Sequence, residues 1–148
     1  MKAKYKEYLK LNKNILIAFA ASIVISAIAA DYFSSQEDYV NTSLTLIVDY
    51  TVFFSTFGGL FYLDNRKKYI LQNGETDKSL LKSDLIKIIS SLGIGEVVYT
   101  IARWSLQYYL LLLNYEPYMA SIISQLISTV IYMATLNLTI KLTKLFKD

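Results

Sequence analysis

The feature that most limits the fold of this chain is the alternation of long apolar blocks with short charged connectors. Hydrophobic residues make up 54% of the 148 residues, and charged residues only 18%. Soluble domains contain roughly 45–50% apolar and about 25% charged residues. A soluble core does not require such segregation, whereas a helix that crosses a bilayer requires about 20 consecutive, mainly apolar residues. The sequence therefore predicts an all-α integral membrane protein.

Four blocks are long enough to cross a bilayer. They cover residues 14–31, 42–63, 84–113 and 118–140, and residues 64–83 form the longest connector. We expect four antiparallel transmembrane helices in a single domain, residues 1–148. The third block exceeds the length of one crossing, so we expect its start to lie at the interface or the helix to be tilted. In the long connector, Asp77 is expected to cap a helix that begins at the membrane surface.

The segment before the first block is basic. Its lysines alternate with Tyr5, Tyr8 and Leu9 at helical spacing, which predicts a short interfacial helix whose lysines reach the headgroups. A basic start, an apolar stretch and Ala27-Ile28-Ala29 are also typical of a secretory signal peptide. We interpret the first block as a retained transmembrane helix.

The positive charges predict the orientation. Of the 15 lysines and arginines, five precede the first block, six lie from Arg66 to Lys87 inclusive, and three follow the fourth block. The other two connectors carry none, and only Arg103 lies deep within a block. Because lysine and arginine in short loops stay on the cytoplasmic side, we expect both termini and the long connector to be cytoplasmic in a cell-membrane protein.

The composition excludes several kinds of chemistry. The chain contains no cysteine and no histidine, which excludes disulfides, thiolate metal sites, cysteine nucleophiles and imidazole proton transfer. We expect no cofactor, no metal and no enzymatic activity. The lysines flank the apolar blocks, so they predict contacts with lipid headgroups and not with nucleic acid.

The strongest functional pattern lies in the third block. Residues at spacings of three and four place polar side chains on one helical face. These residues are Glu96, Tyr99, Thr100, Arg103 and Gln107. Charged groups at bilayer depth cost about 2.5 kcal/mol or more, so this face is expected to point inward and to find partners.

Asp49 in the second block is the expected partner of Arg103, because their depths differ by only about 5 Å along antiparallel helices. The fourth block offers a milder polar face with Gln125, Ser128, Tyr132, Thr135 and Thr139. The first block carries Ala18, Ser22, Ser26 and Ala30 at spacings of four, a stripe that favours close helix packing.

Two functions fit this interior. In the first, Asp49, Glu96, Tyr99, Arg103, Gln107 and Gln125 line the path of a small polar solute or ion through an oligomeric transporter or channel-like protein. In the second, the same groups fix helix register in a non-catalytic subunit of a larger membrane complex. A polar cavity that reaches Glu96 and Arg103 would favour the first, and direct pairing of Asp49 with Arg103 the second. An intramembrane enzyme is the weaker alternative, because Asp49 and Glu96 lie about 10 Å apart in depth.

The plan of the chain resembles two families of small four-helix membrane proteins. The short length, the basic central connector and the ending Lys144-Leu145-Phe146-Lys147 resemble bacterial alanine exporters. The same layout is similar to the GtrA-like family, which is implicated in moving lipid-linked sugars. The third block has Gly95-Glu96-Val97-Val98-Tyr99 where the exporters carry a proline, so the resemblance transfers no residue role.

Overall fold

The protein is almost entirely helical. The structure, a computed structural model, describes residues 3–143, without the side chains of residues 4, 91, 140, 142 and 143. Its helices are α1 (Ala3–Tyr32), α2 (Asp38–Asn65), a 3-10 turn η1 (Arg66–Tyr69), α3 (Lys78–Ser91), α4 (Gly93–Leu112) and α5 (Pro117–Thr143). The predicted all-α class is confirmed. The Lys144–Lys147 ending lies outside the described residues.

The helices have the lengths and apolar character of membrane spans. Helices α1, α2 and α5 are each long and apolar enough to cross a bilayer, and the bent pair α3–α4 is a fourth candidate. Helix α4 alone has 20 residues, which at 1.5 Å per residue is about 30 Å, the thickness of the hydrocarbon layer. The fold is therefore that of a helical membrane protein with three to four candidate spans.

The structure divides the third block, residues 84–113, for which either an interfacial start or a tilted helix was expected. Helices α3 and α4 meet at Leu92 and are bent by 56° relative to each other. Gly93 directly follows this junction, a residue type common at sharp helix bends, and the polarity of the chain also changes there. Helix α3 contains Lys82, Asp84 and Lys87 and has only one apolar side, whereas α4 is apolar on every side but one. Asp77 caps α3 as predicted, since its carboxylate accepts a hydrogen bond from the Leu80 amide at 3.0 Å.

The N-terminal segment also differs from expectation. Helix α1 continues without a break from Ala3 to Tyr32, so the basic start is the first part of this helix and not a separate interfacial helix. The reason lies in its residues: no proline or glycine occurs in α1, so nothing in the chain interrupts its hydrogen bonding between the lysine-rich and apolar parts.

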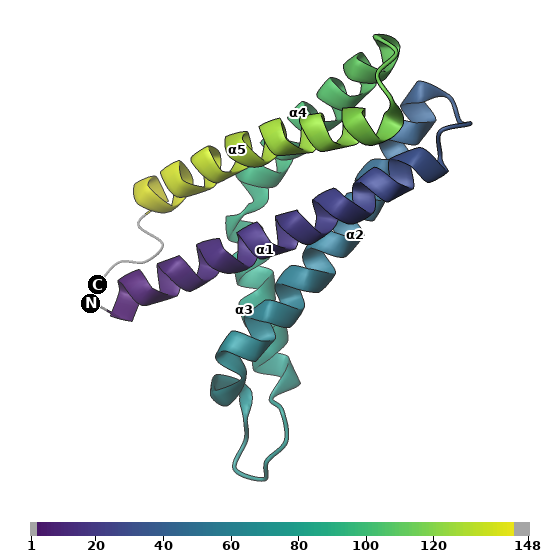
Figure 1. The fold of residues 1–148 in the computed structure, drawn as a ribbon. Coiled ribbons are helices and arrows are strands. Elements are labelled where there is room, and N and C mark those ends of the chain that lie inside the picture. Colours follow the sequence, from purple (N-terminus) through teal and green to yellow (C-terminus); the bar gives the residue numbers. More distant parts are fainter. Residues whose placement is uncertain (1–2, 144–148) are drawn as a thin grey trace.

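The helices form a ring in the order α1, α2, α4, α5, in which each packs against its neighbours. Figure 1 shows α1 and α5 side by side, and α2 diverging from α1 toward the hairpin before α3. The loops 33–37 and 113–116 lie together at one end of the molecule, and the described ends of α1 and α5 lie at the other (Figure 1). We call these the loop end and the terminal end.

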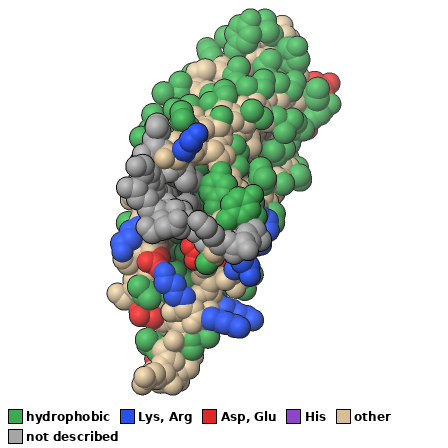
Figure 2. All heavy atoms as spheres, turned by 90° about the vertical axis from the view of Figure 1, so that its left-hand side faces the viewer, with side chains coloured by type: hydrophobic (Ala, Val, Ile, Leu, Met, Phe, Trp, Pro, Cys, Tyr) green, Lys and Arg blue, Asp and Glu red, His purple; other side chains and the backbone are tan. Residues whose placement is uncertain are grey.

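The distribution of side chains is the reverse of that in a soluble protein. Large apolar side chains point outward from every long helix: Val24 is 60% exposed, Ile47 61%, Ile101 64% and Val130 70%. The buried interior holds many polar side chains around an aromatic cluster. Contiguous apolar surface of this extent marks contact with lipid or with other membrane helices. In Figure 2 most of the visible lysines and arginines lie in the lower half, and the upper half is mainly hydrophobic.

Candidate functional site

The predicted polar face of the third block lies on α4 and points into the ring of helices. Tyr99, Arg103 and Gln107 are completely or almost completely buried, and Glu96 and Thr100 are half-buried. The spacing of three and four residues places them on one face because an α-helix has 3.6 residues per turn. The structure thus brings the residues that the sequence singled out to one interior region.

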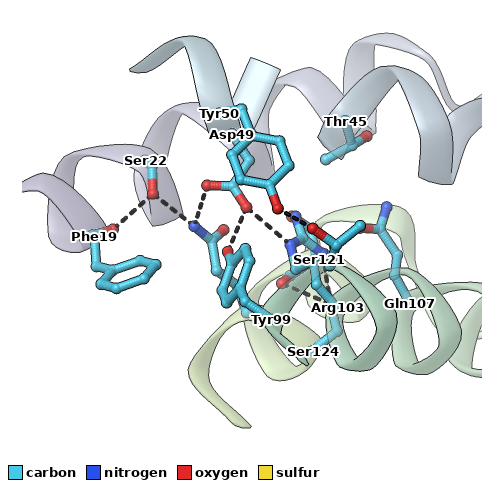
Figure 3. A network of polar contacts seen from close by, with 12 residues as sticks. Phe19, Ser22, Thr45, Asp49, Tyr50, Tyr99, Arg103, Gln107, Ser121 and Ser124 are labelled. Atoms are coloured by element: carbon cyan, nitrogen blue, oxygen red, sulfur yellow. Dashed lines mark hydrogen bonds and ion pairs between the residues drawn. The ribbon is translucent and has the colours of Figure 1, made fainter. Parts of the chain in front are cut away.

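Asp49 on α2 is the partner of Arg103. The Arg103 Nε donates to Asp49 Oδ2 at 3.3 Å, and both side chains are 1% exposed. The Tyr99 hydroxyl donates to the same carboxylate oxygen, and Gln125 Nε2 on α5 donates to the other at 3.0 Å. The two opposite charges therefore contact each other directly inside the protein (Figure 3).

The other two guanidinium nitrogens of Arg103 also donate hydrogen bonds. They donate to the side-chain oxygen of Gln107, to Ser124 Oγ at 2.6 Å and to Ser121 Oγ at 3.1 Å. Gln107 in turn donates to Asn41 Oδ1 at 3.2 Å. We call the connected side chains the ion-pair network. Its members are Ser22, Asn41, Thr45, Asp49, Tyr99, Arg103, Gln107, Ser121, Ser124 and Gln125.

The ion-pair network joins all four long helices of the ring. From α1, Ser22 Oγ accepts a hydrogen bond from Gln125 Nε2 at 2.6 Å, and the Ala30 carbonyl accepts one from Asn41 Nδ2 at 2.9 Å. Asn41 also donates to the Phe33 carbonyl at 3.1 Å, in the loop that joins α1 to α2. The network thus extends from the middle of the bundle to its loop end.

A second set of buried polar groups has few partners. Among the described residues, no hydrogen-bond partner of normal geometry is found for the following buried atoms: Ser26 Oγ, Glu96 Oε1, Gln125 Oε1, Ser128 Oγ, Thr129 Oγ1 and Tyr132 Oη. Four of these belong to one face of α5, because their spacing is three or four residues. The Tyr132 hydroxyl lies close enough to the Glu96 carboxyl group for the two to interact. We call the four α5 atoms together with Glu96 Oε1 the unpaired row.

Glycine at position 95 lets α4 approach α5 at this row. A Cβ atom at Gly95 would lie 3.0 Å from Tyr132 Cε2 and 3.3 Å from Cδ2. Tyr132 is fully buried, and its ring packs edge-on against both Phe19 and Tyr99, with centroids 5.3 Å and 6.0 Å away. The ring therefore has little room to move. The close approach of α4 to α5 depends on the absence of a side chain at Gly95.

Replacing Gly95 with alanine is therefore expected to destabilise the protein by about 1–3 kcal/mol, the usual cost of overpacking a dense core. Gly58 is a matched control, because a Cβ there would meet nothing within 4 Å and α2 is helical at that position. Gly58→Ala should leave stability unchanged or raise it by about 0.5–1 kcal/mol. Unfolding in mixed detergent measures the stability of both variants. Equal stability of the two would contradict a tight contact between Gly95 and Tyr132.

Several members of the ion-pair network did not follow from the sequence pattern. Ser121 and Ser124 were not singled out, because serine in a transmembrane helix usually serves packing. Asn41 was expected in a loop, but α2 begins at Asp38 and buries it. One signal was available: Ser121, Ser124 and Gln125 share a face of α5 with Ser128.

No protein-family model, curated protein or solved structure matches the chain. The fold and the hydrophobic pattern define the class, a helical membrane protein with a polar interior. The resemblance in layout to alanine exporters and GtrA-like proteins stays a resemblance. Within the described residues, no cluster of three or more acidic side chains is arranged to hold a metal ion.

Proposed function

We propose that this protein moves a small polar solute or ion through the membrane, without catalysing a chemical reaction. The observation that supports the proposal is the unpaired row, in which Glu96 faces the polar side of α5 inside the bundle. The row lies between the ion-pair network and the terminal end of the molecule. Several of its atoms have hydrogen-bonding capacity that no described side chain uses.

Buried polar atoms without partners are energetically costly. Each costs about 1–3 kcal/mol, and in lipid no external water reduces that cost. Several such atoms side by side therefore favour the entry of a small polar species that can bond to them. Acidic side chains inside membrane proteins commonly mark ion or proton paths. Glu96 is therefore the residue that we assign to the transported species.

The ion-pair network has a different role in this proposal. Direct contact between Asp49 and Arg103 favours a structural role for that pair, because both charges are already compensated by described side chains. A small solute would have to displace several hydrogen bonds to bind there. We infer that the pair holds the helices in register and closes the path toward the loop end.

Four segments are proposed to span the membrane, with α3 at the interface and α4 as the third span. Both termini and the 64–83 connector would be cytoplasmic, because the positive charges lie at those places. The chain has no cysteine, so single cysteines introduced at the exposed positions Gln72 and Ser35 would report the orientation through a membrane-impermeant thiol reagent. We expect Ser35→Cys to be labelled from outside intact cells. Labelling of Gln72→Cys from outside would exclude this orientation.

An oligomer is expected, since one ring of four helices encloses little accessible volume. The test is flux by the purified protein alone in liposomes that contain a pH-sensitive dye and are given an ion gradient. Transport predicts a dye response that scales with the amount of protein and is absent from empty liposomes. Size measurement in mild detergent should show a homo-oligomer.

A non-catalytic subunit of a larger membrane complex is the second candidate. Two observations favour it: the direct, buried contact between Asp49 and Arg103 and the outward apolar side chains on every long helix. The same purification separates the two functions. Absence of flux together with foreign subunits in fixed proportion would support the subunit and exclude autonomous transport.

A further inference from the structure

A pocket of about 370 Å³ opens between the start of α1 and the region where α2, η1 and α3 meet. Small-molecule sites commonly enclose about 300–1,000 Å³, so this pocket is large enough for a ligand. It lies on the side of Leu92 away from the ion-pair network and does not include Glu96. It is therefore separate from the path proposed above, and a ligand could bind there whether or not that path exists.

The charged side chains that line the pocket carry a net positive charge. Lys10, Lys68 and Lys87 line it, and they outnumber its two acids, Glu7 and Asp84. Lys68 Nζ is 2.7 Å from Asp84 Oδ2, so this pair offsets one positive charge. The lysines come from three different elements, α1, η1 and α3, and their positive charge is brought together only by the fold.

The remaining walls of the pocket combine an apolar surface with one buried amide group. Leu11, Phe61, Ile88 and Leu92 supply an apolar surface. Asn14 also lines the pocket; it is 2% exposed, and its Oδ1 has no hydrogen-bond partner among the described residues. A matching ligand therefore carries a negative charge, a hydrogen-bond donor and an apolar part.

The pocket also lies at a suitable depth. Asn14 is the residue at which the uncharged block of α1 begins, so the pocket is at the boundary between basic and apolar segments. In the view onto the terminal end, lysines and arginines surround a few acidic side chains (Figure 2). Basic pockets between membrane helices are a known mode of binding anionic lipid headgroups.

We propose that this pocket binds an anionic phospholipid whose headgroup bears hydroxyl groups. The lysines would hold the phosphate, and Asn14 Oδ1 would accept a hydrogen bond from a headgroup hydroxyl. The apolar walls would contact the first part of an acyl chain. The bound lipid would thereby connect α1 to α3 at the terminal end, where the helices diverge.

The test is native mass spectrometry of the detergent-purified protein. Phosphatidylglycerol or phosphatidylcholine of the same acyl-chain length is added before the detergent is removed. We expect one tightly bound phosphatidylglycerol per chain and much weaker binding of phosphatidylcholine. The double variant Lys10→Gln/Lys87→Gln keeps the Lys68–Asp84 pair. It should bind phosphatidylglycerol roughly 25-fold more weakly, because each lysine near an anionic headgroup contributes about fivefold.

The matched control is Lys67→Gln/Lys82→Gln, which removes the same charge from exposed positions outside the pocket. The affinity of this control for phosphatidylglycerol should change by less than about twofold if the lipid is attracted by the pocket lysines and not by the net charge of the protein. Equal losses in the two double variants would overturn the proposal. Displacement of the lipid by inorganic phosphate at the same concentration would also overturn it, because the site would then recognise a soluble anion.

Discussion

Replacing Arg103 with alanine is expected to lower the free energy of unfolding by about 3–5 kcal/mol, the cost of removing one member of a buried ion pair. The substitution would leave the Asp49 carboxylate buried and without a compensating charge. It would also remove the donor that Gln107, Ser121 and Ser124 share. The loss should appear as a much lower midpoint of unfolding in mixed detergent.

A double variant separates the ion pair from its surroundings. Replacing both partners, as Asp49→Leu/Arg103→Met, removes the two charges and keeps most of the volume. Such replacements are often neutral or stabilising in other proteins, so we expect the double variant to be more stable than Arg103→Ala alone. Arg66→Ala, at an exposed position just after α2, is the control for the loss of an arginine. A stable Arg103→Ala protein would show that the pair does not hold the helices together.

The second large effect is expected at Glu96, where glutamine should reduce flux at least tenfold without loss of stability. Glutamine has nearly the same size but cannot carry a negative charge or exchange a proton. Because no other acid belongs to the unpaired row, nothing in that row would replace the carboxylate. The measurement is the initial rate of the dye response in liposomes, normalised to the amount of inserted protein.

The control for Glu96 is Glu116→Gln, an exposed acid in the loop between α4 and α5. It should transport at the rate of the unaltered protein. Equal flux from the Glu96 variant would remove that residue from the mechanism. A folded Glu96→Gln protein without flux, beside an Arg103→Ala protein that is destabilised, would assign transport to the unpaired row and stability to the ion-pair network.

The sequence predicted much of the fold because a bilayer imposes simple requirements. A span needs about 20 apolar residues, and a charge within it must face inward, so the blocks and the inward face of α4 followed from composition and spacing. The partner of Arg103 also followed, because antiparallel helices place Asp49 at a similar depth. The position of the bend at Leu92 did not follow, because the length of the third block was equally consistent with one tilted helix.

By itself, the sequence determined the class of protein and which face of α4 is buried, because hydrophobic periodicity is a property of local sequence. Only the tertiary structure decided which polar groups are satisfied. Asp49 and Arg103 contact each other directly, whereas Ser128 Oγ and Thr129 Oγ1 have no hydrogen-bond partner among the described residues. The lysine-lined pocket is equally a product of packing, since its charges come from distant parts of the chain. Such distinctions depend on distances between helices, and a linear pattern does not contain those distances.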